Sequence, residues 1–377
     1  MIQHLNILIC PDKFKGSLTA EEVCQAIAKS IRKLSPGSRI SQVPMADGGE
    51  GSLEIINNQL KAEIIRIKAS DPLGRPVEAE FLMKGDNAYI EMAKASGLQL
   101  LKPEERSATR TSTEGTGELI REAIQFGAKK IYLLVGGSAT NDAGIGMAKA
   151  LGFGFSDAAG NEVEPTGENM IRIKKIHKSL QDFGGVEFSV LCDVENPLYG
   201  KNGAAHVFGR QKGADDREIA ELDEGLKNMS ELFRETFGVD VQKIPGAGAA
   251  GGIAGGAVAF LGAEIKSGIG TLMEIAELED KIKAADLVIT GEGKIDSQTL
   301  NGKVIAGIAA KAGKYNKTVL AFCGKLDLEF SEVRGMGLIA VFPIKQEGMS
   351  DEDAMEKAGD KLEKLAEKEL TGYIKHS

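Results

Sequence analysis

The stretch from residue 136 to residue 146 carries the densest set of groups suited to binding an anion. It reads GGSATNDAGIG and directly follows the apolar run 131–135, which predicts a strand that ends in a loop. Glycines let the backbone approach a phosphate closely, and the hydroxyl groups of Ser138 and Thr140 add hydrogen-bond donors. A helix that starts near Met147 would place its N-terminus, which favours negative charge, beside this loop. The loop therefore predicts phosphate or nucleotide binding, although a glycine-rich turn between strand and helix also occurs for structural reasons alone.

Four further polar loops each follow an apolar run, at residues 11–17, 46–51, 193–203 and 291–299. Carboxyl ends of parallel strands are where α/β proteins place their sites, so five such loops together point to a site more strongly than one. Lys13 and Lys15 could neutralise a carboxylate or phosphate. Asp47, Asp193 and Asp296 could hold Mg²⁺ or orient a hydroxyl group. The alternatives are solvated lysines and acids that merely complement a helix dipole.

A second glycine-rich stretch, residues 246–252, reads GAGAAGG and fits the dinucleotide pattern G-x-G-x-x-G. The segment before it is a poor strand and Pro245 adjoins the first glycine, so a Rossmann dehydrogenase site is the less favoured interpretation. The pattern G-x-x-x-x-G-K-[ST] is absent, because no Gly-Lys pair is followed by Ser or Thr. If ATP binds to this protein, it does not bind through a Walker A loop.

The elements that must position these loops alternate between strand and helix at both ends of the chain. Strands are predicted over residues 5–10, 39–45, 64–68, 286–290, 318–323 and 338–344, and a capping box at Thr19 opens a helix with an apolar stripe. Residues 71–76 are typical of a turn, and the segments 77–83 and 88–92 indicate an antiparallel hairpin. We therefore predict an α/β fold with two domains. Residues 1–70 and 281–377 would form a Rossmann-like parallel-sheet domain, and residues 71–280 an inserted second α/β domain.

Composition limits the class of protein. A chain of 377 residues with 42% hydrophobic and 27% charged residues is long enough for about two globular domains, and no run approaches the ~20 apolar residues of a membrane span. No secretory signal is visible, so we expect a cytoplasmic protein. A net charge of −9 argues against a nucleic-acid partner and favours a small molecule. The four scattered cysteines predict free thiols, the four histidines show no metal-ligand spacing, and the oligomeric state is left open.

Seven motifs in this order resemble those of the type-1 glycerate kinases: residues 11–18, 44–51, 115–120, 136–142, 193–198, 211–214 and 289–293. The resemblance runs from residue 11 to beyond residue 300. It implies phosphorylation of D-glycerate with ATP and Mg²⁺ as cofactors, at the 2- or 3-hydroxyl group with the 2-position favoured. It also implies a two-domain α/β architecture with one domain inserted. Lys13, Ala143 and Arg210 depart from the usual serine, glycine and proline of the family motifs.

Phosphoryl transfer needs charge neutralisation and in-line positioning more than covalent help from the protein, and this guides the assignment of roles. Asp193 is expected to orient the glycerate hydroxyl group, with Asp47 and Lys15 as further catalytic residues. Lys13, Arg75 and Lys212 are expected to bind glycerate or the γ-phosphate, and Asp296 to contact the metal. The nucleotide phosphates are assigned to the two glycine-rich stretches, through Gly136, Gly137, Ser138, Thr140, Asn141, Gly246, Gly248, Gly251 and Gly252.

Two other functions fit parts of the sequence. A nicotinamide-dependent hydroxy-acid dehydrogenase would use the stretch 246–252, but it would need a histidine or lysine base and a ribose-binding acid after a proper strand. A non-catalytic nucleotide or metabolite sensor would need fewer acids and lysines at strand ends than this sequence carries.

Overall fold

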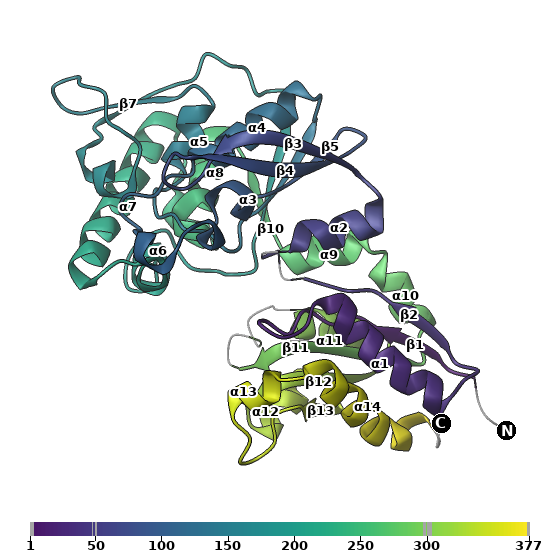
Figure 1. Ribbon diagram of the computed structural model, residues 1–377. Coiled ribbons are helices and arrows are strands. Elements are labelled where there is room, and N and C mark those ends of the chain that lie inside the picture. Colours follow the sequence, from purple (N-terminus) through teal and green to yellow (C-terminus); the bar gives the residue numbers. More distant parts are fainter. Residues whose placement is uncertain (1–3, 47, 50, 297–298, 300–303, 375–377) are drawn as a thin grey trace. The chain divides into compact units, whose positions relative to one another are not determined.

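The computed structural model describes residues 4–46, 48–49, 51–296, 299 and 304–374. The chain divides into two compact units: unit 1 consists of Met1–Asp47 and Ile269–Ser377, and unit 2 of Gly48–Gly268 (Figure 1). Unit 1 is therefore built from both ends of the chain, and unit 2 is one continuous insertion. Each unit is an α/β structure with its own sheet, so the predicted fold class is confirmed.

Unit 1 contains a parallel five-stranded sheet in the order β13-β12-β11-β1-β2. Its strands are β1 (Asn6–Ile9), β2 (Arg39–Gln42), β11 (Leu287–Ile295), β12 (Thr318–Leu326) and β13 (Ala340–Pro343). The chain passes from β1 to β2 on one side and from β11 to β12 and β13 on the other. The winding direction therefore changes between β1 and β11, which is where open α/β sheets bind ligands.

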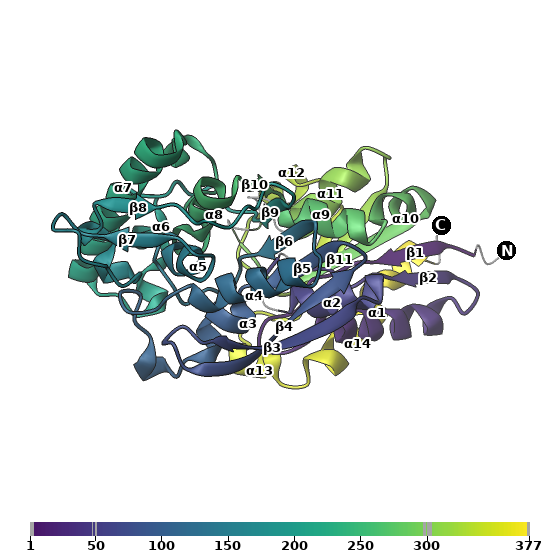
Figure 2. The same cartoon turned by 90° about the horizontal axis from the view of Figure 1, so that it is seen from above.

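Helices cover both faces of this sheet. They are α1 (Ala20–Leu34), α9 (Gly268–Ile275), α10 (Leu278–Ala284), α11 (Val304–Gly313), α12 (Phe330–Gly335), α13 (Asp351–Met355) and α14 (Ala358–Ile374). Helix α1 opens with the predicted capping box, in which Thr19 accepts from the backbone N–H of Glu22. Its apolar stripe packs with α14 and with alternate residues of the strands in one core. Figure 2 shows α1 and α14 on one side of the sheet and α10 and α11 on the other.

Unit 2 contains a six-stranded mixed sheet in the order β10-β9-β6-β5-β4-β3 and a two-stranded ribbon, β7-β8. Strands β10, β9, β6 and β5 are parallel, and β4 and β3 continue the sheet in antiparallel pairing. The strands are β3 (Glu63–Ser70), β4 (Pro76–Lys84), β5 (Asn87–Glu91), β6 (Lys130–Leu134), β7 (Gly154–Ser156), β8 (Lys175–His177), β9 (Glu187–Leu191) and β10 (Glu264–Lys266). The predicted hairpin is the β4–β5 pair, with Lys84 opposite Asn87.

The α-helices of unit 2 are α2 (Ser52–Leu60), α3 (Ala93–Ser96), α4 (Glu114–Gln125), α5 (Ile145–Ala150), α6 (Ala204–Phe208), α7 (Asp216–Phe237) and α8 (Ile253–Leu261). The division between the units lies at residues 47/48 and 268/269, whereas the sequence analysis placed boundaries at 70/71 and 280/281. The reason for the first difference is that β3 pairs along its whole length with β4, which makes it part of the inserted sheet.

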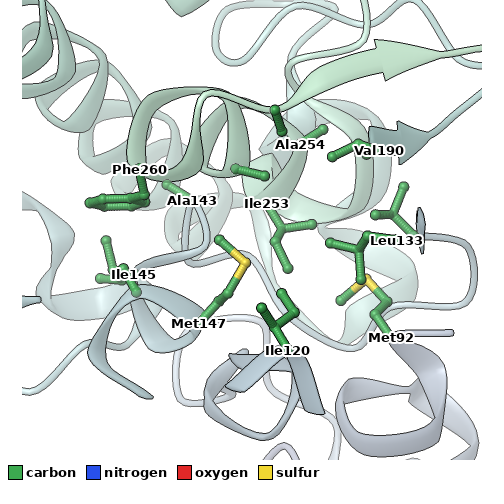
Figure 3. Close-up of a cluster of buried hydrophobic side chains, with 14 of the residues drawn as sticks. Met92, Ile120, Leu133, Ala143, Ile145, Met147, Val190, Ile253, Ala254 and Phe260 are labelled. Carbon is green, nitrogen blue, oxygen red and sulfur yellow. The ribbon is translucent and has the colours of Figure 1, made fainter. Parts of the chain in front are cut away.

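A dense apolar core lies beneath the glycine-rich loop that follows β6. In Figure 3 the side chains of Ala143, Ile145 and Met147 lie in one cluster with Ile253 and Leu133. Because close-packed interiors resist deformation, this core holds the loop's C-terminal half against α8 and the sheet.

Candidate functional site

The parallel strands of unit 2 end in one row, and polar loops leave the sheet directly after it. The row consists of register partners on neighbouring strands: Glu91 in β5, Leu134 in β6, Leu191 in β9 and Lys266 in β10. The glycine-rich loop, Asp193 and Ser267 therefore all start from the same edge of the sheet. This is the edge at which parallel α/β sheets place their ligands.

A buried lysine holds the glycine-rich loop in shape. The Nζ atom of Lys212 donates hydrogen bonds to Oγ of Ser138 at 2.8 Å and to the carbonyl oxygen of Thr140 at 2.6 Å, and Lys212 is only 1% exposed. Burial lowers the pKa of Lys212 to about 7, although the nearby Asp142 carboxylate opposes the shift. The amino group of Lys212 is thus hydrogen-bonded to the loop itself. Its predicted contact with glycerate or the γ-phosphate stays a prediction.

Asp142 anchors the other half of the same loop. Its carboxylate accepts from the backbone N–H and the hydroxyl group of Thr113, both at 2.8 Å, and from the N–H groups of Gly144 and Gly146 at 3.0 and 3.3 Å. Burial raises the pKa of Asp142, and the hydrogen bonds counteract that rise. Sequence reasoning gave Asp142 no role, because a single acid inside a glycine-rich loop does not reveal four donors that converge on it.

Two side chains in this loop are buried without hydrogen-bond partners in the described part of the chain. They are Thr140, through Oγ1, and Asn141, through both Oδ1 and Nδ2, and each residue is 0% exposed. Buried polar groups are normally paired, since an unpaired one costs about 1–3 kcal/mol. The Thr140 hydroxyl group and the Asn141 amide group are thus available for hydrogen bonds, and their predicted contact with the nucleotide phosphates stays a prediction.

The glycines of the stretch 246–252 are packed closely against other loops. A Cβ atom on Gly248 would lie 2.1 Å from the carbonyl oxygen of Pro197, and one on Gly251 would lie 2.0 Å from that of Thr140. The N–H of Ala143 donates to the carbonyl oxygen of Gly251 at 3.0 Å, which joins the two glycine-rich stretches. Close backbone approach is thus a sufficient reason for glycine at 248 and 251. Contact of the predicted Gly246, Gly248, Gly251 and Gly252 with nucleotide phosphates stays a prediction.

The dinucleotide interpretation of the same stretch fails on its local structure. The residues before it form a short 3-10 helix, Val241–Lys243, and another 3-10 segment follows at Ala249–Gly252. A dinucleotide fingerprint requires a strand that runs directly into the glycine-rich turn. The dehydrogenase alternative therefore loses the feature on which it depended.

Asp193 is held by a residue that the sequence analysis missed. Oγ of Ser267 donates to Oδ1 of Asp193 at 2.8 Å. Asp193 follows β9, and Ser267 follows the adjacent parallel strand β10, so both lie at the same sheet edge. Strand β10 is only three residues long, and so short an element gave no sequence signal that could place Ser267 beside Asp193.

Arg75 closes the turn between β3 and β4. Its Nε lies 2.6 Å from a carboxylate oxygen of Asp71, and its Nη1 lies 2.7 Å from one of Glu105. Asp71 also accepts from the N–H groups of Leu73 and Arg75 at 2.8 and 2.9 Å. Two carboxylates thus engage the guanidinium group, and its predicted contact with glycerate stays a prediction.

A buried carboxylate fixes the segment that leads into α2. Glu91, at the end of β5, accepts from the N–H groups of Gly51 and Leu53 at 3.2 and 3.1 Å, where a negative charge complements the helix N-terminus. A Cβ atom on Gly136 would lie 2.3 Å from the Cα atom of Gly49, so the turn before α2 packs against the glycine-rich loop. Asp47, one of the predicted catalytic acids, lies outside the described residues.

In unit 1, Lys13 and Lys15 follow β1 and line a pocket of about 480 Å³ at the carboxyl ends of the strands. Asp296, at the end of β11, has a carboxylate oxygen 3.1 Å from Nζ of Lys294. The backbone N–H of Asp296 donates to Oγ1 of Thr299, whose hydroxyl group in turn donates to Glu292. The predicted roles of Lys13 in substrate binding, of Lys15 in catalysis and of Asp296 in metal binding stay predictions.

The sequence also led to expectations about metal ligands, cysteines and membrane-spanning segments. Across the described residues, no group of three or more His, Cys, Asp or Glu side chains is arranged to hold a metal ion. All four cysteines are free, as predicted, and Cys10, Cys24 and Cys323 are buried. None of the described helices has the length and apolar character needed to cross a membrane.

The structure is that of an α/β protein in which a glycine-rich loop suited to anions and the carboxylate of Asp193 leave the same edge of one sheet. The sequence profile of the Glycerate kinase family matches residues 7–372. The chain belongs to the glycerate kinase family.

Individual relatives extend over nearly the whole chain. The glycerate 2-kinase of Escherichia coli (strain K12) is 44% identical over 349 residues, which are 90% of either chain. A glycerate kinase of Halalkalibacterium halodurans is 42% identical over 364 residues, which cover 96% of both chains. A crystal structure of a Salmonella typhimurium LT2 protein, described provisionally as glycerate kinase 2, has a TM-score of 0.84 and 39% identity, with 99% of each chain covered. The resemblance inferred from seven motifs is thereby confirmed.

Proposed function

We propose that this protein transfers the γ-phosphoryl group of ATP to the 2-hydroxyl group of D-glycerate. The observation that carries the proposal is the edge of the unit 2 sheet, where the loop braced by Lys212 and the carboxylate of Asp193 follow neighbouring strands. Family membership supplies the substrate class. The name of the Escherichia coli relative, glycerate 2-kinase, supports the choice of the 2-hydroxyl group.

Phosphoryl transfer requires the acceptor oxygen to lie in line with the phosphorus atom and the leaving group. The hydroxyl oxygen forms the new P–O bond, the bond from phosphorus to ADP breaks, and the hydroxyl proton leaves to a base or to water. Asp193 is the carboxylate that we assign to orient this hydroxyl group and take its proton, with its own orientation fixed by Ser267. Thr140 and Asn141 offer the donors and acceptors that bind the glycerate carboxylate or a phosphate oxygen.

Mg²⁺ fits the residues present as an ion that accompanies the nucleotide. Magnesium in kinases is typically held by one or two carboxylates together with phosphate oxygens and water, so a dedicated cluster of three protein ligands is not required. Asp12 and Glu292, 8% and 4% exposed, are the buried acids at the unit 1 pocket that could serve. When bound, the ion would neutralise the charge that develops on the phosphates.

A coupled assay of ADP release tests the proposal. Turnover is expected only when ATP, Mg²⁺ and D-glycerate are all present, and the NMR spectrum of the product should show phosphorus coupled to the proton on carbon 2. Phosphorylation at carbon 3 would leave the kinase class intact but refute the 2-position. Reduction of NAD by a hydroxy acid without ADP release would favour a dehydrogenase, and ATP binding without turnover would favour a sensor. The cytoplasmic location expected from the sequence stays a prediction.

A further inference from the structure

The pocket of unit 1 lies where the winding of the parallel sheet changes direction. Its lining comes from the loop after β1 and from the carboxyl ends of β11, β12 and β13, including Lys15, Lys294, Lys325 and Lys345. These segments are far apart in sequence, and each contributes at least one lysine. A site assembled in this way is distinct from the glycine-rich loop of unit 2, because every lining residue belongs to unit 1.

The size of the pocket favours the larger of the two ligands of the reaction. Its volume is about 480 Å³. Pockets for cofactors and drug-sized ligands span roughly 300–1,000 Å³. A three-carbon acid such as glycerate fills the volume of only about three or four water molecules, on the order of 100 Å³. The pocket is therefore suited to a much larger molecule than glycerate.

Among the residues that line the pocket, lysines outnumber acids: five lysines face three acids, Asp12, Glu292 and Asp351, so the lining carries a formal charge of +2 and favours an anionic ligand. Lys294 and Lys325 both lie within 3.1 Å of Asp327, so each is held at the end of its strand. Lys15 is exposed, and no carboxylate of the described residues lies within ion-pairing distance of its amino group. One lysine without a carboxylate partner, together with two lysines fixed by ion pairs in the same lining, matches the several phosphate groups of one ligand.

Part of the pocket wall is apolar. It includes Ile344 after β13 and Ala354, Met355 and Ala358 of α13 and α14. Met355 is 51% exposed although it is a large apolar side chain. An exposed methionine beside buried alanines provides a flexible apolar surface of the kind on which a planar ring can lie.

We propose that the unit 1 pocket binds the nucleoside triphosphate of the kinase reaction, with its phosphates at Lys15 and Lys325 and its base against Met355. The inference rests on the proposed function and makes it more specific. It differs from the assignment of nucleotide phosphates to the glycine-rich stretches of unit 2. Those stretches would then serve glycerate and the transferred phosphoryl group, and the glycines at 248 and 251 would serve packing.

The assignment is tested by calorimetry, which measures how tightly a nonhydrolysable ATP analogue binds to the full chain in the absence of glycerate. Lys15→Ala and Lys325→Ala should each weaken binding by about tenfold to a hundredfold, as expected when a charge-assisted hydrogen bond is lost. Met355→Asp should weaken it as well, because a carboxylate would meet the ligand. Lys314→Ala is the matched control, since Lys314 is an exposed lysine of unit 1 outside the pocket. This variant should bind the analogue with unchanged affinity.

Hydrogen exchange on the unaltered protein gives a second measurement that does not depend on how the variants fold. The analogue should protect residues 13–17 and 351–358. Unchanged affinity in all three pocket variants, or protection confined to residues 136–146, would overturn the inference and place the nucleotide in unit 2. If the analogue binds as expected but glycerate is never phosphorylated, the pocket assignment survives and the proposed reaction fails.

Discussion

Ser267 donates a hydrogen bond to the carboxylate of Asp193 at 2.8 Å, across the ends of two adjacent parallel strands. The bond restricts the rotation of a carboxylate at the carboxyl edge of the unit 2 sheet. A base that is held in one orientation loses less entropy when it meets the substrate. We therefore propose that Ser267 is a positioning residue and that Asp193 is the group that touches glycerate.

Replacing Asp193 by asparagine should remove the charge and keep the shape. We expect kcat to fall by roughly 10² or more, the low end for a positioned general base, with little change in KM for ATP. Ser267→Ala should lower kcat by less, because the carboxylate remains. Steady-state kinetics and a thermal melt of each variant provide the measurements, and near-normal turnover of Asp193→Asn would assign the role to another acid.

Ser138 and Thr140 should respond differently to the loss of their hydroxyl groups. Ser138→Ala removes a partner of the buried Lys212 ammonium group and should reduce the free energy of unfolding by about 1–3 kcal/mol. Thr140→Val removes a hydroxyl group that has no partner among the described residues and should leave stability unchanged while activity falls. Urea unfolding together with kcat/KM separates the two effects. Equal destabilisation by both changes would refute the unpartnered state of Thr140.

Lys212 should make stability depend on pH in a defined direction. Its pKa is about 7 in the folded protein, below the ordinary lysine value of 10.5, so between these values the unfolded chain carries one more proton. Stability should therefore rise with pH across that window, by at most about 1.4 kcal/mol per pH unit, and stay flat below it. The difference in unfolding free energy between the wild type and Lys212→Met isolates this contribution. A difference that is constant with pH, or that falls, would contradict the lowered pKa of the buried Lys212 amine.

Gly251 and Gly262 form a matched pair for the packing role of the second glycine-rich stretch. Both have positive φ, +75° and +64°, but a Cβ atom on Gly251 would collide with Thr140 whereas one on Gly262 meets open space. Gly262→Ala should cost about 1 kcal/mol from the left-handed backbone alone. Gly251→Ala should cost several times more, because overpacking adds to the strain. Similar melting temperatures for the two variants would show that the loop can move aside.

The sequence alone was sufficient for the elements with strong local signals. The capping box at Thr19 and the hairpin at Lys84 and Asn87 depend on residues close together in the chain, and both are present. The partner of β3 could not be predicted in the same way. Periodicity identifies a strand but does not say which neighbour it pairs with, and so the sequence-based boundary fell after residue 70.

The candidate site shows the same limit. The loop after β6 was recognisable from its glycines and hydroxyl groups, but Lys212 lies 74 residues from Ser138, and nothing local reveals that its amino group is buried there. The stretch 246–252 looked like a nucleotide loop because close approach of two protein backbones selects glycine as strongly as close approach of a phosphate does. Only the three-dimensional arrangement separates these two causes.

Because β11 lies in the middle of the unit 1 sheet, unit 1 can complete its fold only after unit 2 has been synthesised. Strands β1 and β2 emerge early from the ribosome, yet β11, which pairs with β1, and α14, which covers α1, come after the whole of unit 2. At a translation rate of about 5–20 residues per second, roughly 5–20 s separate the completion of Gly268 from that of Ile374. During that interval unit 2 can fold, while the apolar face of α1 is uncovered. Newly made chains of this protein should therefore need a chaperone at their N-terminal segment for longer than at the segment that follows it.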